Sequence, residues 1–98
     1  MTYSETLSRH RRLAILRHLE ASAEYSANGH ILTDTLRGLG ITSTYDQVLT
    51  ELQWLREQGY AHVEDLGGII LATATPRGVE IATGVTTHPG IQRPLPRG

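Results

Sequence analysis

The chain has 98 residues, a formal net charge of −1, and 39% hydrophobic residues, so we expect one modest core and a single domain. There is no cysteine, which excludes disulfides, thiolate catalysis and cysteine-based metal sites. The longest apolar stretch, Gly67 to Ala72, is too short to span a bilayer, and the N-terminus lacks a secretory pattern. We therefore expect a soluble cytoplasmic protein.

Helical spacing of apolar residues predicts a first helix near residues 5–21, with Ser4 as its cap and Glu5 near the positive end of its dipole. Basic residues are expected to fill much of its surface. A short irregular segment around Tyr25 is interpreted as a connector or a brief strand. A second helix is predicted from about Asn28 to Gly38 and Gly40.

The clearest helix is predicted at residues 44–58, ending before Gly59. The run from Ser43 to Asp46 resembles a capping box in which Asp replaces the usual Glu or Gln. Its apolar face consists of Tyr45, Val48, Leu49, Leu52 and Leu55. The link from Gly40 to Ser43 has the length of the turn in a helix-turn-helix.

After Gly59 the apolar period becomes that of a strand, residues 60–65, followed by a Gly67-Gly68 turn and a return strand over residues 69–74. Thr75-Pro76 then starts a short helix that stops at Gly84. The predicted fold class is mainly α with a small β-hairpin (α+β), over residues 1–84. Residues 85–98, with three of the four prolines, are interpreted as a flexible C-terminal arm.

Two segments carry a resemblance to a known family. The stretch VLTELQWLREQGY, residues 48–60, resembles the third helix and following strand of winged-helix transcription regulators. Residues 74–82 resemble the L-T-x-x-G entry to the final helix of those regulators. With SRHRRLAIL at residues 8–16 and the PGIQRP tail, the whole chain resembles a small protein of Mu-like phages and prophages, of the kind labelled ArsR-like regulators.

This resemblance implies a winged helix-turn-helix with a three-helix core, a wing and a short C-terminal helix. The cysteines of the metal-sensing branch are missing, so it does not imply metal-regulated repression. In such a fold helix 44–58 enters the major groove. Gln47 and Thr50 would then contact base edges, with Thr44 beside them, and Tyr45 and Ser43 would reach phosphate. The alternative is that these are ordinary solvated helix residues.

The charge distribution is the main objection to DNA binding. From Gly40 to Leu66 there is one Arg against five acids, a net charge of −4. Phosphate attraction would therefore have to come from elsewhere. The candidates are a basic cluster on the first helix, with a solvated helix face as the alternative, and a tail pair that could enter a minor groove, with plain disorder as the alternative. The cluster consists of Arg9, Arg11 and Arg12, and the tail pair of Arg93 and Arg97.

The sequence gives little support for metal binding or catalysis. Trp54 lies away from the leucine stripe of its helix, which predicts packing against the hairpin, the first helix or a partner. The five histidines have no metal-binding spacing, and no catalytic constellation is present, so we expect no metal, no cofactor and no enzyme activity.

Two hypotheses remain. The first is a phage-type transcriptional regulator that binds double-stranded DNA as a homodimer, because one short helix reads few base pairs. The second is a protein-interaction module on a winged-helix scaffold, such as a phage assembly or packaging accessory with a phage protein as its partner.

Overall fold

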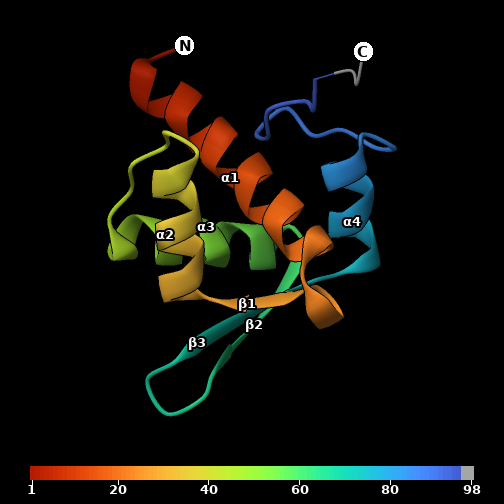
Figure 1. Ribbon diagram of the computed structural model, residues 1–98. Helices are drawn as coiled ribbons and strands as arrows, with labels where there is room; N and C mark the ends of the chain where they lie inside the picture. Colours follow the sequence, from red (N-terminus) through yellow and green to blue (C-terminus); the bar gives the residue numbers. More distant parts are fainter. Residues whose placement is uncertain (96–98) are drawn as a thin grey trace.

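The computed structural model describes residues 1–95 of the chain (Figure 1). These residues form four α-helices and a small three-stranded sheet, so the α+β class is confirmed. The elements are α1 (Tyr3–Ala21), β1 (Ser26–Asn28), α2 (Gly29–Gly38), α3 (Tyr45–Glu57), β2 (Ala61–Asp65), β3 (Ile70–Ala74) and α4 (Pro76–Thr83). The segment interpreted as a connector or a brief strand is a tight turn followed by β1.

The sheet is antiparallel, with β3 between β1 and β2. The β2–β3 hairpin turns at Gly67 and Gly68, which have positive φ angles of 69° and 96° as a two-residue hairpin loop requires. The amide of Leu66 donates to the carbonyl of Ile69 over 2.8 Å and closes the loop. Because β1 pairs with only three residues of β3, the far end of the hairpin projects beyond the helices (Figure 1).

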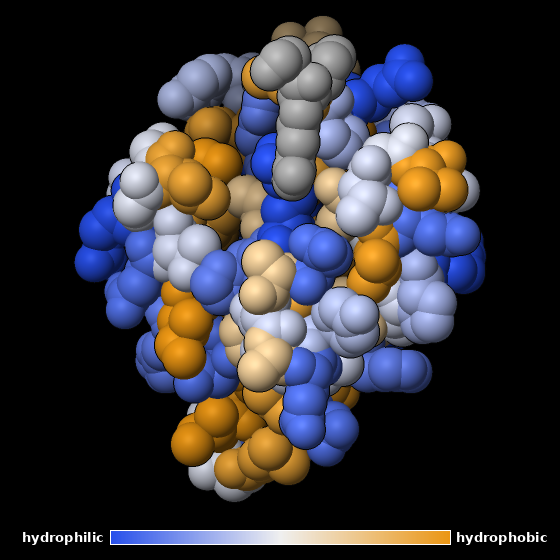
Figure 2. Space-filling model, turned by 45° about the vertical axis from the view of Figure 1, so that its right-hand side comes forward, coloured by the Kyte–Doolittle hydropathy of each residue, from blue (hydrophilic) through white to orange (hydrophobic). Residues whose placement is uncertain are grey.

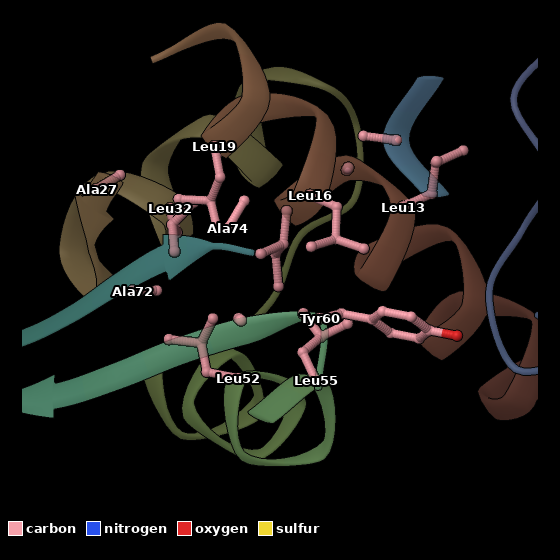
Figure 3. Packing of buried hydrophobic residues seen from close by; sticks show 14 of the residues in the cluster. Leu13, Leu16, Leu19, Ala27, Leu32, Leu52, Leu55, Tyr60, Ala72 and Ala74 are labelled. Atoms are coloured by element: carbon pink, nitrogen blue, oxygen red, sulfur yellow. The ribbon is translucent and has the colours of Figure 1, made fainter. Parts of the chain in front are cut away.

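The core is built from aliphatic side chains of the helices packed on small residues of the sheet (Figure 3). Leu16 and Leu19 of α1 lie on one side of Ala72, and Leu52 and Leu55 of α3 lie on the other. All five are at most 1% exposed. Because alanine is small, α1 can approach β3 closely. Burying each leucine contributes about 1.5–3 kcal/mol relative to leaving it in water.

The first helix begins earlier than expected. Thr2 is its N-cap, and the side-chain oxygen of Thr2 accepts from the amide of Glu5 over 3.1 Å. The prediction of Ser4 as the cap was therefore wrong. Thr2 lies three residues before Glu5, which is the spacing that an N-cap oxygen needs to reach the third helical amide.

The third helix has a complete capping box, shifted by one residue from the expected one. The hydroxyl of Thr44 accepts from the amide of Gln47 over 3.1 Å, and the Oε1 atom of Gln47 accepts from the amide of Thr44 over 2.9 Å. The predicted pair of Ser43 and Asp46 was wrong because the hydroxyl of Ser43 is buried and bonded to Arg11 instead.

The entry to α4 is fixed by a close approach of two backbones. The hydroxyl of Thr75 donates to the carbonyl of Gly59 over 2.7 Å and accepts from the amide of Gly78 over 3.1 Å. A Cβ atom added at Gly78 would overlap the carbonyl oxygen of Tyr60. This corner explains why the Thr-x-x-Gly motif stands at this point of the chain.

The C-terminal segment is anchored to the domain through residues 90–92. Ile91 is 1% exposed and belongs to the core. The amide of Gln92 donates to the carbonyl of Arg9 over 3.1 Å, and the Nη1 atom of Arg12 donates to the carbonyl of Gly90 over 2.9 Å. The expectation of a flexible arm therefore needs correction for residues 88–92. Residues 96–98, which include the predicted Arg97, lie outside the described part of the chain.

Candidate nucleic-acid interface

Helices α2 and α3 are joined by a short turn, and α3 presents a polar face beside it. The turn is closed by the amide of Ile41, which donates to the carbonyl of Leu36 over 2.8 Å. Val48, Leu52 and Leu55 bury the opposite side of α3 in the core. The exposed polar residues in the first half of α3 and at its cap are Thr44, Asp46, Gln47 and Thr50. Three of the predicted site residues are therefore brought together on one accessible surface.

The hydrogen bonds within this surface limit what it can offer a ligand. The Oε1 atom of Gln47 is occupied by the amide of Thr44, so the free group of this side chain is its Nε2 donor. The hydroxyl of Thr50 donates to the carbonyl of Asp46 over 2.9 Å, which leaves its lone pairs as acceptors. The face thus offers a side-chain donor at Gln47 next to acceptors at Thr50 and Asp46.

Next to this face lies an open groove of about 540 Å³ between α2 and the start of α3. Tyr45 is half-buried on its α3 side and stacks on the ring of His30, with 4.2 Å between centroids and 10° between planes. On the α2 side lies Arg37, whose side chain is 67% exposed and whose Nη1 atom makes a long contact of 3.7 Å with Asp34 Oδ1. Arg37 and His30 were not among the predicted site residues. The sequence could have indicated Arg37 as a site residue, because it stands in the last turn of the helix that precedes the predicted helix-turn-helix link.

Two arginines of the predicted basic cluster point into the protein. The Nη1 atom of Arg11 lies 3.2 Å from Glu51 Oε2, and the Nε atom of Arg12 lies 2.9 Å from Glu51 Oε1. The Nε atom of Arg11 also donates to the hydroxyl of Ser43 over 2.7 Å. The side chains of Arg11 and Glu51 are 7% and 4% exposed. This buried cluster, which we call the Arg–Glu–Arg triad, joins α1 to α3.

The ion pairs of the triad change the surface charge that the sequence predicts. Glu51 counted among the acids of the α3 region, yet its charge is neutralised inside the fold. Arg11 and Arg12, expected to attract phosphate, are used in the same pairing, and Ser43 is buried with them. The interpretation that Arg11 lies on the helix surface was wrong. Arg9 is half-buried, with its Nη1 atom 3.4 Å from the sulfur of Met1.

Trp54 packs against the first helix, which is one of the three contacts predicted for it from the sequence. The guanidinium of Arg12 lies over its ring at 3.8 Å from the centroid. His88 meets the same ring edge-on, with 5.2 Å between centroids, and is 5.9 Å from the ring of Tyr60. The C-terminal segment therefore covers Trp54 together with α1, a contact that the sequence reasoning did not foresee.

The hairpin offers little to a nucleic acid. No arginine lies between Arg56 and Arg77, while Glu64 and Asp65 are both exposed. One oxygen of Asp65 accepts from the amide of Gly68 over 2.8 Å, which holds the carboxylate at the turn. The polar face of α3 and the adjoining groove also contain carboxylates, Asp46 and Asp34, but they add the exposed cation of Arg37. This surface is therefore the candidate interface.

Two further features bear on the kind of protein. Within residues 1–95, no three side chains of the metal-binding types lie close enough to hold an ion. Across the same residues, none of the helices has the length and apolar character needed to cross a membrane.

These features define a small α+β protein with a helix pair that exposes a polar face. Its sequence is similar to gp26 of Escherichia phage Mu, with 38% identity over 94 residues that cover 96% of this chain and 97% of gp26. It is also similar to a protein of Haemophilus influenzae, with 37% identity over 84 residues that cover 85% of this chain and 81% of that protein. No protein-family model matches the sequence. The chain belongs to the family of the phage Mu protein gp26.

Proposed function

We propose that this protein is a DNA-binding protein of the winged helix-turn-helix type, related to ArsR-like regulators, that regulates transcription for a Mu-like phage in the bacterial cytoplasm. The order α2, turn, α3, hairpin and α4 supports the winged-helix assignment. The single observation that carries the proposal is the exposed polar face of α3, next to a groove lined by Arg37 and His30. Double-stranded DNA is the proposed ligand, bound by a homodimer.

The hydrogen bonds of α3 suggest how bases would be read. The free Nε2 donor of Gln47 suits the acceptors that guanine and thymine present in the major groove. The bidentate contact of Gln with adenine needs both side-chain groups, and one of them is occupied here. Thr44 and Thr50 flank Gln47 and would contact neighbouring bases or phosphates.

Phosphate contacts would come from the groove between α2 and α3. Arg37 replaces Arg11 and Arg12 in this role, because its guanidinium is exposed and held only by a long contact to Asp34. Tyr45 and His30, stacked in the same groove, offer further polar atoms for the DNA backbone. One strong cation per copy is few, which is a further reason to propose two copies on the DNA.

The proposal is tested by fluorescence anisotropy of a labelled duplex at about 50 and about 200 mM salt. Wild-type affinity should fall steeply between the two salt concentrations. Arg37→Gln should weaken binding and reduce the slope of log affinity against log salt by about 1 for each copy bound. Arg56→Gln, which removes an exposed charge from the far end of α3, is the matched control and should retain the wild-type slope. Absence of binding at tens of micromolar protein at the lower salt would refute the proposal.

One observation favours the alternative function of a protein-interaction module. The end of the hairpin is acidic and apolar, with Leu66 and Ile69 exposed next to Glu64 and Asp65. Such a surface suits a protein partner better than DNA. A wild-type protein that fails to bind DNA in the anisotropy experiment would favour this function.

A further inference from the structure

The end of the β2–β3 hairpin is an exposed apolar knob with negative charge. Leu66 is 52% and Ile69 is 53% exposed, and Figure 2 shows apolar side chains gathered at the lower end of the molecule, where the hairpin lies. Glu64 and Asp65 stand directly beside them. The loop is held in one shape by its backbone hydrogen bond and by the contact of Asp65 with the Gly68 amide. We call residues 64–70 the hairpin tip.

A groove with the opposite charge lies on the same chain between α1 and the C-terminal end of α2. Its volume is about 460 Å³. Its lining consists of apolar side chains, which we call the floor, and of polar and basic side chains, which we call the rim, with no carboxylate among them. The floor consists of Leu13, Ala14, Leu39 and Ile41, and the rim of Arg17, His10, His18 and Thr35, of which Arg17 carries the formal positive charge. We call this the α1–α2 groove.

We infer that the hairpin tip of one copy of the protein inserts into the α1–α2 groove of a second copy. Leu66 and Ile69 would cover the apolar floor, and Glu64 and Asp65 would face the basic rim at Arg17. The groove is large enough for the side chains of Leu66 and Ile69. An apolar cavity of about 150 Å³ already holds a benzene molecule, and the groove is about three times larger.

The contact has to form between copies rather than within one. In Figure 1 the hairpin tip lies at the lower end of the molecule, whereas the C-terminal end of α2 and the adjoining part of α1 lie towards the upper end. The polar residues of α3 belong to neither surface, so they stay accessible in the associated protein. The inference therefore does not depend on DNA binding, and each can fail without the other.

Sedimentation equilibrium of the full chain tests the inference. The weight-average mass should rise above the monomer mass of 10.8 kDa by about 100 µM protein. Leu66→Ser in the tip and Leu39→Ser in the groove should each weaken association about 10-fold or more. Val85→Ser is the matched control, because Val85 is 71% exposed and lies in neither surface. Since all three side chains are exposed, circular dichroism should show unchanged folding.

Mixing the two variants makes the test specific to this pair of surfaces. Leu66→Ser keeps an intact groove and Leu39→Ser keeps an intact tip, so an equimolar mixture should have a higher average mass than either variant alone. Raising the salt to about 0.5 M should weaken the wild-type association, because the charges at the rim become screened. A wild-type protein that stays monomeric at about 100 µM, variants that associate as the wild type does, or a mixture no heavier than its components would overturn the inference.

Discussion

The Arg–Glu–Arg triad makes a sharp prediction about stability. Glu51 is the one carboxylate that Arg11 and Arg12 share, and its side chain is 4% exposed. Glu51→Ala would leave the guanidinium of Arg11, 7% exposed, without an acid partner inside the protein. Removing one member of a buried ion pair costs about 3–5 kcal/mol, because the remaining charge stays desolvated.

This cost is large for a domain of this size. A small domain is stable by about 5–15 kcal/mol, so Glu51→Ala should remove a substantial fraction of the free energy of unfolding. With a urea dependence of about 1–3 kcal/mol per molar, the midpoint of unfolding should fall by roughly 2 M. Glu51→Gln keeps the shape, but it loses the charge and replaces one of the two acceptor oxygens by an NH2 donor that faces an arginine, so it should cost a similar amount.

Urea unfolding followed by circular dichroism and by Trp54 fluorescence measures both variants. Trp54 is a suitable second probe because Arg12 of the triad lies over its ring. Glu57→Ala is the control on the same helix, since Glu57 is exposed and should change stability by less than about 0.5 kcal/mol. A Glu51→Ala protein as stable as the Glu57→Ala protein would refute the assignment of the triad as a structural ion pair.

Three further changes test other parts of the structure. Gly78→Ala should destabilise by at least about 2 kcal/mol through its clash with the Tyr60 carbonyl, whereas Gly38→Ala, with free space around its Cβ, should stabilise slightly; urea unfolding compares the two. Ile91→Ala should cost about 2–4 kcal/mol in the same measurement, and a change near zero would show that the C-terminal segment is not anchored. Gln47→Glu keeps the capping box but removes the Nε2 donor, so stability should hold while DNA affinity measured by anisotropy falls about 10-fold; unchanged affinity would remove Gln47 from the interface.

The secondary structure could be predicted because its signals are local. Apolar residues at helical spacing located α3, and Gly59, with φ of 80°, ends it as expected. The Gly67-Gly68 pair located the hairpin, because both residues need positive φ. The capping box was misplaced by one residue because Ser43 and Thr44 both have hydroxyls, and only the tertiary contact of Ser43 with Arg11 separates them.

Residues of the candidate site could be predicted only where helical spacing alone decides whether a side chain is exposed. Thr44, Gln47 and Thr50 are exposed on α3, as helical spacing predicts, and their contact with DNA stays a prediction. The roles of Arg11 and Arg12 depend on Glu51, about forty residues away, so sequence spacing could not reveal the pairing. The basic cluster on α1 therefore resembled a surface patch.

The anchoring of the C-terminal segment also could not be predicted from local sequence patterns. Its prolines and glycines predict an arm, but Ile91 fills a place in the core that is formed by distant elements. His88 and Gly90 complete the contact, against Trp54 and Arg12 respectively. A single apolar residue carries no periodic signal, so composition alone could not indicate that the segment is anchored.

The most direct test of the proposed function is a titration of ¹⁵N-labelled protein with a short duplex, followed by amide NMR spectra. We expect the largest shift changes at residues 42–50 and at Arg37, with little change at residues 64–70 of the hairpin. This result would locate DNA on the polar face of α3 and its groove. Unchanged spectra at about 100 µM duplex, or changes centred on the hairpin, would contradict the proposal that this surface binds DNA.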